Sequence, residues 1–235
     1  MLAIEKLNQF YGESHTLWDL DLDVPAGQCT CVMGRNGVGK TTLMKAIMGE
    51  VAVKSGQLRY QGDSSEIELT KKAVEARSRM GIGFVPQGRQ IFPLLTVEEN
   101  LRTGLAARSD GLKKIPERIY ELFPVLKEMK HRRGGDLSGG QQQQLAIGRA
   151  LVIEPKLLIL DEPGEGIQPN IVAQIGQVIR QLIKEDGLTV LLVEQKLPFA
   201  RKYADRFVIM DRGRPVAKGE ISELSNELIK QHLTV

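Results

Sequence analysis

Cysteine, histidine and long apolar runs are scarce in this sequence of 235 residues. The two cysteines, Cys29 and Cys31, are two positions apart on a predicted strand, so their side chains face the same side. Two thiols do not make a zinc site, and a disulfide at this spacing would be strained. We therefore expect reduced, packed thiols. The histidines His15, His131 and His232 have no metal-ligand spacing, so a histidine metal centre is not indicated.

No apolar run approaches the roughly 20 residues that a membrane-spanning helix needs. Residues 1–5 lack the basic and long apolar regions of a signal peptide. The net charge of +3 is small, and the charged residues are interspersed instead of forming a basic stripe. The composition therefore does not imply nucleic-acid binding. We expect a cytoplasmic protein that can dock on a membrane protein, with one substantial core and a smaller subdomain.

Residues 34–42, with the sequence GRNGVGKTT, are predicted to form a phosphate-binding loop. A buried strand is predicted before the loop, and apolar residues after it recur at helical spacing. The backbone amides of such a loop converge on phosphate oxygens at the positive end of the helix dipole. Lys40 would reach the β and γ phosphates, and the Thr41 hydroxyl suits a bridging Mg²⁺. The full pattern disfavours the plainer alternative, a glycine-rich turn with a surface lysine. The predicted binding residues are Gly34, Arg35, Asn36, Gly37, Val38, Gly39, Lys40, Thr41 and Thr42.

Three further strands are predicted to deliver polar side chains to the edge of the sheet that carries this loop. The buried run at 157–160 ends in Asp161 and Glu162. Asp161 can hold Mg²⁺ or its water, while Glu162 can orient and deprotonate an attacking water. The strand at 189–193 brings Glu194 and Gln195 to the same edge. Gln87 follows the strand at 82–85, where open α/β sheets bind ligands, although a plain loop amide fits that position equally well.

A second anion site is predicted at residues 137–141, which read LSGGQ. Ser138 and Gln141 form a capping box at the start of a helix, and Gly139 and Gly140 leave its amides open to an anion. One nucleotide at the first loop cannot easily touch both sites within one small chain, which points to a dimer. Near the amino terminus, Tyr11 precedes a flexible turn and could stack on a flat base, although a core tyrosine is the simpler interpretation.

The order of these patterns predicts an α/β fold. Residues 2–33 and the strand at 55–60 indicate an antiparallel β region, and residues 88–146 form a helical insert with one helix beginning at Thr96 and another over 116–130. A hairpin near 211–214 and a polar helix from about residue 220 end the chain. We expect a P-loop NTPase core over 1–87 and 147–235, with an antiparallel β subdomain at its amino-terminal end, and a helical subdomain over 88–146 that carries the second anion site.

Together these motifs resemble the nucleotide-binding subunit of ATP-binding-cassette (ABC) transporters over essentially the whole chain. The LSGGQ signature at 137–141 is the most specific of them. The resemblance implies that the chain hydrolyses ATP with Mg²⁺, that Tyr11 stacks on adenine, and that Gln87 links Mg²⁺ and water to a membrane partner. It also implies that Ser138 and Gly140 contact the γ-phosphate held by the opposite subunit, so that two chains sandwich two ATP molecules.

Three segments are similar to the urea-importer ATPase subunits, a branch of the branched-chain amino acid importers. They are residues 88–93, residues 134–144 and residues 165–169. This similarity ranks urea first as the solute, with branched-chain amino acids or amides as the alternative. It implies two membrane permease subunits, a second ATPase subunit and an extracytoplasmic solute-binding protein, with this chain on the inner face of the cell membrane. We expect a heterodimer of ATPase subunits, and a homodimer stays open.

The sequence departs from the wider family at three positions. Gln195 stands where most relatives have a histidine, and an amide can hydrogen-bond a γ-phosphate but cannot carry a proton, which leaves Glu162 as the base. Gln168 replaces a usual aspartate, and Gly164 replaces a usual hydroxyl residue. Gly164 adds backbone freedom beside Glu162 and could lower turnover.

Two other classes of function are disfavoured. Soluble signature-motif ATPases that act on DNA or ribosomes insert long coiled coils or carry two cassettes, whereas Lys40 and Ser138 are only 98 positions apart here (138 − 40). A P-loop kinase would need an acceptor site and would lack the LSGGQ signature.

Overall fold

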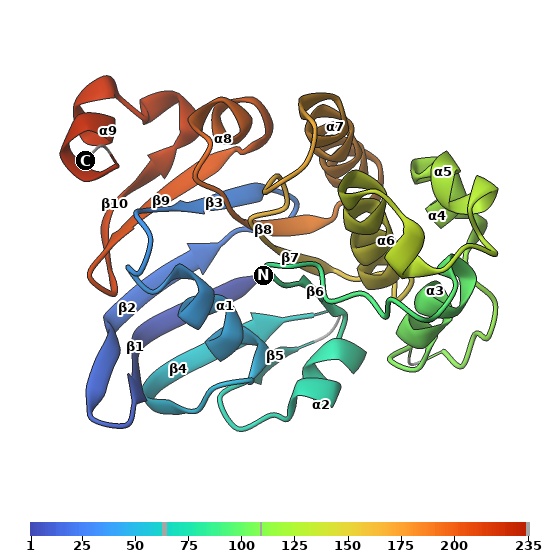
Figure 1. The fold of residues 1–235 in the computed structure, drawn as a ribbon. Helices are drawn as coiled ribbons and strands as arrows, with labels where there is room; N and C mark the ends of the chain where they lie inside the picture. The colour runs from blue at the N-terminus through green and yellow to red at the C-terminus, as the bar shows by residue number, and fades with distance from the viewer. Residues whose placement is uncertain (63–64, 109, 234–235) are drawn as a thin grey trace.

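The computed structural model describes residues 1–62, 65–108 and 110–233. Two β-sheets lie beside a group of helices (Figure 1). The smaller sheet has the strand order β2-β1-β4-β5 and is antiparallel. Buried and exposed residues alternate over much of β1 and β2, because one face of this sheet packs on the core. Its strands are β1 Leu2–Tyr11, β2 Ser14–Val24, β4 Val53–Gln61 and β5 Glu66–Glu68.

The larger sheet has the order β10-β9-β3-β8-β7-β6. The strands from β9 to β6 run parallel, and β10 pairs antiparallel with β9 at one edge. Every residue of β3, β7 and β8 is buried, as expected for parallel strands that are covered on both faces. The strands are β3 Cys29–Met33, β6 Ile82–Val85, β7 Leu157–Asp161, β8 Thr189–Val193, β9 Arg206–Asp211 and β10 Arg214–Glu220.

The predicted antiparallel region at 2–33 was too long. Residues 29–33 form β3, which leaves the smaller sheet and pairs in parallel with β8 and β9. Residues 29–33 have no polar alternation that would tolerate a wet face, so β3 needs cover on both faces, and its place in the larger sheet is set by the strands and helices that provide this cover.

The helices group around the larger sheet. Figure 1 shows α3, α4 and α5 beyond its β6 edge, far from β10 and α9, while α6 and α7 lie over its face. None of the described helices is long and apolar enough to cross a membrane. Their bounds are α1 Lys40–Met48, α2 Val74–Arg79, α3 Val97–Leu105, α4 Glu117–Leu122, α5 Pro124–Glu128, α6 Gly139–Leu151, α7 Pro169–Asp186, α8 Leu197–Tyr203 and α9 Asn226–His232, with 3₁₀ turns at Gly134–Asp136 and Ile221–Glu223.

Two helix predictions were wrong in their extent. The single helix predicted over 116–130 is divided into α4 and α5 at Phe123, because Pro124 pushes the residue before it out of the helical region and offers no N–H to continue the ladder. The carboxy-terminal helix begins at Asn226 and not near 220, since β10 extends to Glu220 and Ser225 caps α9 by accepting a hydrogen bond from the Leu228 amide.

Both predicted capping boxes are confirmed. The Thr96 hydroxyl accepts from the Glu99 amide at 3.2 Å, and the Glu99 carboxylate accepts from the Thr96 amide at 2.7 Å. The same reciprocal pair joins Ser138 and Gln141 at the start of α6. These boxes fix where α3 and α6 begin, and the second of them places the signature residues at a helix amino terminus.

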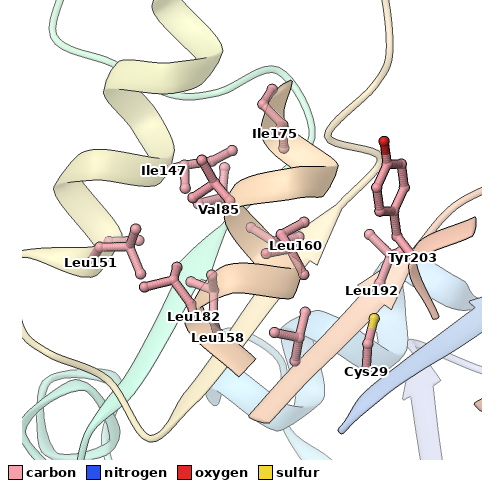
Figure 2. Close-up of a cluster of buried hydrophobic side chains, with 14 of the residues drawn as sticks. Cys29, Val85, Ile147, Leu151, Leu158, Leu160, Ile175, Leu182, Leu192 and Tyr203 are labelled. Carbon is pink, nitrogen blue, oxygen red and sulfur yellow. The ribbon is translucent and has the colours of Figure 1, made fainter. Parts of the chain in front are cut away.

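The core has two parts on opposite faces of the larger sheet. Figure 2 shows the part under α6, α7 and α8, where strand residues such as Cys29, Leu160 and Leu192 face helix residues such as Ile147 and Ile175. The other part packs α1 between the two sheets. Cys29 and Cys31 are free and fully buried, and burial raises the pKa of the Cys29 thiol to about 12. The expected packed thiols are confirmed.

Candidate functional site

The predicted phosphate loop connects β3 to α1 and depends on glycine at close approaches. Gly34 has φ +152°, and a Cβ there would lie 2.5 Å from the carbonyl oxygen of Met210. Gly39 caps α1 with φ +103°, where a side chain would be strained and would press on Leu17. No side chain fits at Gly34 without moving the backbone, so the turn that exposes the loop amides requires these glycines.

Lys40 folds back over this loop. Its ammonium donates hydrogen bonds to the carbonyl oxygens of Gly34 and Arg35, both at 2.8 Å. Burial lowers the pKa of Lys40, while the carboxylates of Glu162 and Asp161 act in the opposite direction. A cation is therefore held between the glycine loop and two carboxylates, where it can neutralise a phosphate.

Several loops that are distant in sequence line one cavity of about 710 Å³ beside the phosphate loop. Its polar lining suits a charged ligand. The residues are Thr16, Asn36, Gly37, Gly39, Lys40, Thr41, Thr42, Gln87, Glu162, Glu165, Gly166, Glu194, Gln195 and Lys196. The structure thus brings together most of the predicted phosphate-binding residues with Gln87, Glu162 and Gln195.

Asp161 is the last residue of β7 and is almost fully buried. Among the described residues, neither of its carboxylate oxygens has a hydrogen-bond partner. Burial raises the pKa of Asp161; the Thr41 hydroxyl lies close enough to oppose this rise, although its geometry falls short of a hydrogen bond. Buried oxygens without a partner are costly unless another group satisfies them, so Asp161 and Thr41 together fit Mg²⁺, which prefers hard oxygen ligands.

Glu162 follows directly and is held between two amides. Its backbone is left-handed at φ +51°, and its N–H donates to the Val193 carbonyl at 2.9 Å. The Gln195 amide donates to one carboxylate oxygen of Glu162, and the Gln87 amide donates to the other at 3.4 Å. The Gln195 amide also donates to the Asn36 side chain at 2.8 Å. The two predicted amides therefore orient the predicted base.

Residues 194 to 196 add further contacts around Gln195 at the edge of the sheet where the sequence placed Glu194 and Gln195. Glu194 is buried, and one of its oxygens accepts from the backbone N–H groups of Gln195 and Lys196 at 2.8 and 2.9 Å. The Lys196 ammonium donates to the Gly164 carbonyl at 2.7 Å. Burial raises the pKa of Glu194, and its two backbone bonds oppose the rise. This carboxylate shapes the turn that presents Gln195.

Sequence reasoning did not include five residues of the cavity among the site residues: Thr16, Glu165, Gly166, Glu194 and Lys196. Glu194 and Lys196 flank the predicted Gln195, and Glu165 and Gly166 follow the predicted Glu162, so nearness to the ends of β7 and β8 was an available signal. Thr16 had no such signal, because only the packing of β2 against the phosphate loop brings it to the cavity.

The signature residues do not line the cavity beside the phosphate loop. Ser138, Gly139, Gly140 and Gln141 line a second cavity of about 490 Å³ between α6 and the start of α7. Gly166 lines both cavities. Within one chain the phosphate loop and the signature therefore line different cavities. This agrees with the sequence analysis, which predicted two separate anion sites.

Tyr11 lies at the tip of the β1 and β2 hairpin and is 48% exposed. It is paired with Ser14, and Thr16 follows Ser14 by two residues on the face that reaches the cavity. The rings of Phe10, His15 and Trp18 form a separate stack. Tyr11 itself lies outside the cavity lining, and its adenine role stays a prediction.

A glycine loop between a parallel strand and a helix, with a buried lysine and a strand-end Asp-Glu pair, defines a P-loop nucleotide-binding protein. A model of the ABC transporter family matches residues 17–165. The chain therefore belongs to the ABC transporter family. It is the ATPase component, which hydrolyses ATP with Mg²⁺, and such subunits work as dimers with membrane permease subunits.

Relatives match nearly the full length. The chain is 43% identical over 217 residues to the high-affinity branched-chain amino acid transport ATP-binding protein BraG of Pseudomonas aeruginosa, covering 92% of this chain and 91% of that protein. It is 38% identical to the probable branched-chain amino acid transport ATP-binding protein LivF of Archaeoglobus fulgidus, covering 95% and 94%. A nucleotide-free ATP-binding cassette from an ABC transporter superposes with a TM-score of 0.80 at 28% identity, covering 98% and 94%. The predicted fold is confirmed.

Proposed function

We propose that this chain is the ATPase subunit of an importer for branched-chain amino acids or related amides. The observation that carries the proposal is the similarity to BraG and LivF over more than nine-tenths of the chain, since both names refer to branched-chain amino acid transport. Another relative, 34% identical, is an arginine transport ATP-binding protein of Escherichia coli.

The ranking of urea as the first solute is not supported by these relatives. That ranking came from segments at 88–93, 134–144 and 165–169, which lie next to the two cavities described above. Such segments serve ATP and subunit contacts, whereas the solute is recognised by other proteins of the transporter. Similarity confined to these loops therefore carries little information on the solute, and the amino-acid alternative fits the whole chain better.

The geometry supports a division of roles within the site. Lys40 and the loop amides would bind the phosphates, and Thr41, Asp161 and Gln87 would hold Mg²⁺, which supplies positive charge against the phosphate oxygens. Glu162 would orient and deprotonate the attacking water. Gln195 would hydrogen-bond the γ-phosphate while fixing the Glu162 carboxylate.

The proposal also covers how this chain assembles with the other subunits of the transporter. Ser138 to Gln141 lie in a different cavity from Lys40, which supports a pair of ATPase chains, each completing the site of the other. We infer a heterodimer with a second ATPase subunit on two permease subunits at the inner face of the membrane, with a solute-binding protein outside. The division into a core over 1–87 and 147–235 and a helical subdomain over 88–146 belongs to this proposal.

Uptake of labelled solutes by intact cells tests the proposed transport function. Labelled leucine and labelled urea are supplied to cells with the gene intact, deleted, or carrying Lys40→Ala. Loss of leucine uptake alone in both altered strains is the expected result. Loss of urea uptake alone would overturn the amino-acid assignment and keep the motor role. Loss of neither would contradict both, and a Lys71→Ala strain, altered at an exposed loop lysine, controls for expression.

A further inference from the structure

The loop that leads from β6 towards α3 begins in an unusual conformation. Gly88, Arg89 and Gln90 follow one another with φ of +78°, +68° and +47°. A left-handed backbone costs a residue with a side chain roughly 1–2 kcal/mol, so two such residues in succession persist only when their surroundings hold them. The contacts of Arg89 identify what holds this loop.

The Arg89 guanidinium bridges two other segments. One terminal nitrogen donates to the Gln142 side-chain oxygen on α6 at 3.3 Å, and the other donates to the Glu165 carbonyl oxygen after β7 at 3.4 Å. A Cβ at Gly139 would lie 3.2 Å from both nitrogens. The fork of the guanidinium thus lies against the first turn of the signature helix and reaches the loop that follows Glu162.

Each partner of Arg89 is itself fixed. While the Gln142 oxygen accepts from Arg89, its amide nitrogen donates to the Gly134 carbonyl at 3.2 Å. Two turns further along α6, Arg149 donates to the Gln90 carbonyl at 2.8 Å. The loop at 88–90 is therefore attached to α6 at two points, which accounts for its left-handed backbone.

The same loop is attached to the catalytic side of the cavity. Gln87 donates to the Glu165 carboxylate at 3.0 Å and to the Glu162 carboxylate at 3.4 Å. Arg89 holds the backbone carbonyl of the same Glu165. In the described part of the chain Arg89 has no ion pair, so its contribution is directional hydrogen bonding and not charge pairing.

We propose that Arg89 is a positioning residue that fixes the signature helix α6 relative to the Glu162 carboxylate. Its side-chain hydrogen bonds go to Gln142 and Glu165 and not to the residues proposed to hold phosphate, so it acts through these two partners. A lysine cannot replace it, because a single ammonium on a flexible stem does not reproduce the planar fork that meets two acceptors on different segments. The inference rests on the proposed roles of Glu162 and the signature residues, and not on the identity of the solute.

The test uses the chain purified by a tag with the subunits that copurify with it. Arg89→Met, which removes both hydrogen bonds of the bridge, and Arg89→Lys, which keeps at most one, are each expected to lower kcat for ATP hydrolysis about tenfold or more. The Kd for ATP, measured without turnover, should change less than about twofold, because the phosphate loop is untouched. Arg102→Met, which removes an exposed arginine of α3 that pairs with Glu98, is the matched control and should retain full activity.

A double-mutant cycle separates positioning from a general structural effect. Gln142→Ala should also lower kcat, and adding it to Arg89→Met should cause little further loss, because both changes break the same bridge. An unchanged kcat in Arg89→Met would overturn the proposal. So would additive effects of the two changes, or a parallel fall in melting temperature and ATP affinity. If Glu162→Gln hydrolysed ATP normally, the proposed site itself would fail, and that result is distinct from any outcome of the cycle.

Discussion

Glu194 and Gly164 show how individual side chains decide the shape of the site. Glu194 uses one oxygen to hold the turn before Gln195, while among the described residues its other oxygen has no hydrogen-bond partner. A Cβ at Gly164 would lie 3.2 Å from that second oxygen. Gly164 has no side-chain donor, so in the described part of the chain this second oxygen of a buried carboxylate stays without a partner.

We expect Gly164→Ser to stabilise the chain. A serine hydroxyl at this position can donate to the free Glu194 oxygen, and a hydrogen bond to a charged group contributes about 1.5–3 kcal/mol. For a chain of this size that corresponds to a rise in melting temperature of several degrees. The melting temperature is measured by calorimetry. Gly164→Ala is the control, since its methyl group meets the same oxygen without donating; an equal rise in both variants would contradict the explanation.

At the scale of elements, α1 depends on a buried arginine at its carboxyl end. Arg77 from α2 donates to the carbonyl oxygens of Ala46 and Ile47 at 2.8 and 2.6 Å, and to that of Lys72 at 2.9 Å. A positive charge at this end also complements the helix dipole. Burial lowers the pKa of Arg77, and Glu68 opposes this. The helix that begins with Lys40 is thus held at its far end by the region around α2.

Arg77→Met should destabilise the chain by about 2 kcal/mol or more, because the Ile47 carbonyl at the end of α1 would lose its buried donor, whereas that of Ala46 still accepts from the Gly49 amide. Chemical denaturation gives the free energy of unfolding. Arg79→Met, which removes an exposed arginine from the same helix, is the matched control and should have little effect. Equal losses in the two variants would show that the buried bonds of Arg77 contribute nothing specific.

At the scale of the whole molecule, the two cavities account for assembly. Lys40 and Ser138 line different cavities, which supports the proposed pair in which each chain completes the ATP site of the other. The chain is not strongly charged, with a net charge of +3, which presents little obstacle to association of two such subunits.

Glu162→Gln should separate binding from turnover. An amide keeps the size of the side chain but cannot accept the proton of water, so hydrolysis should fall at least a hundredfold while ATP still binds. Purified together with the second ATPase subunit and kept with ATP, the variant should elute at the mass of a pair of ATPase chains, whereas with ADP the chains should elute singly. Chromatography with light scattering and a phosphate-release assay measure the two effects. Near-normal hydrolysis would remove Glu162 as the base, and an unchanged mass would contradict the paired arrangement.

The sequence by itself determined the local features of this protein. The glycine loop at 34–42, the capping boxes at Thr96 and Ser138, and the buried strands before Asp161 and Gln195 depend on neighbours in the chain, so spacing and residue type were sufficient. The family also followed from these motifs. The break at Pro124 was readable as well, but a regular apolar spacing across it concealed the boundary.

Only the tertiary structure decided which distant residues meet. Whether β3 joins the smaller or the larger sheet depends on which partners cover its two faces. Thr16 reaches the cavity because β2 packs on the phosphate loop, and Arg77 and Arg89 act across 30 and 53 positions of sequence. Such contacts leave no periodic pattern in the sequence. A hydrogen bond between distant segments depends on where those segments lie in the folded chain and not on local residue spacing.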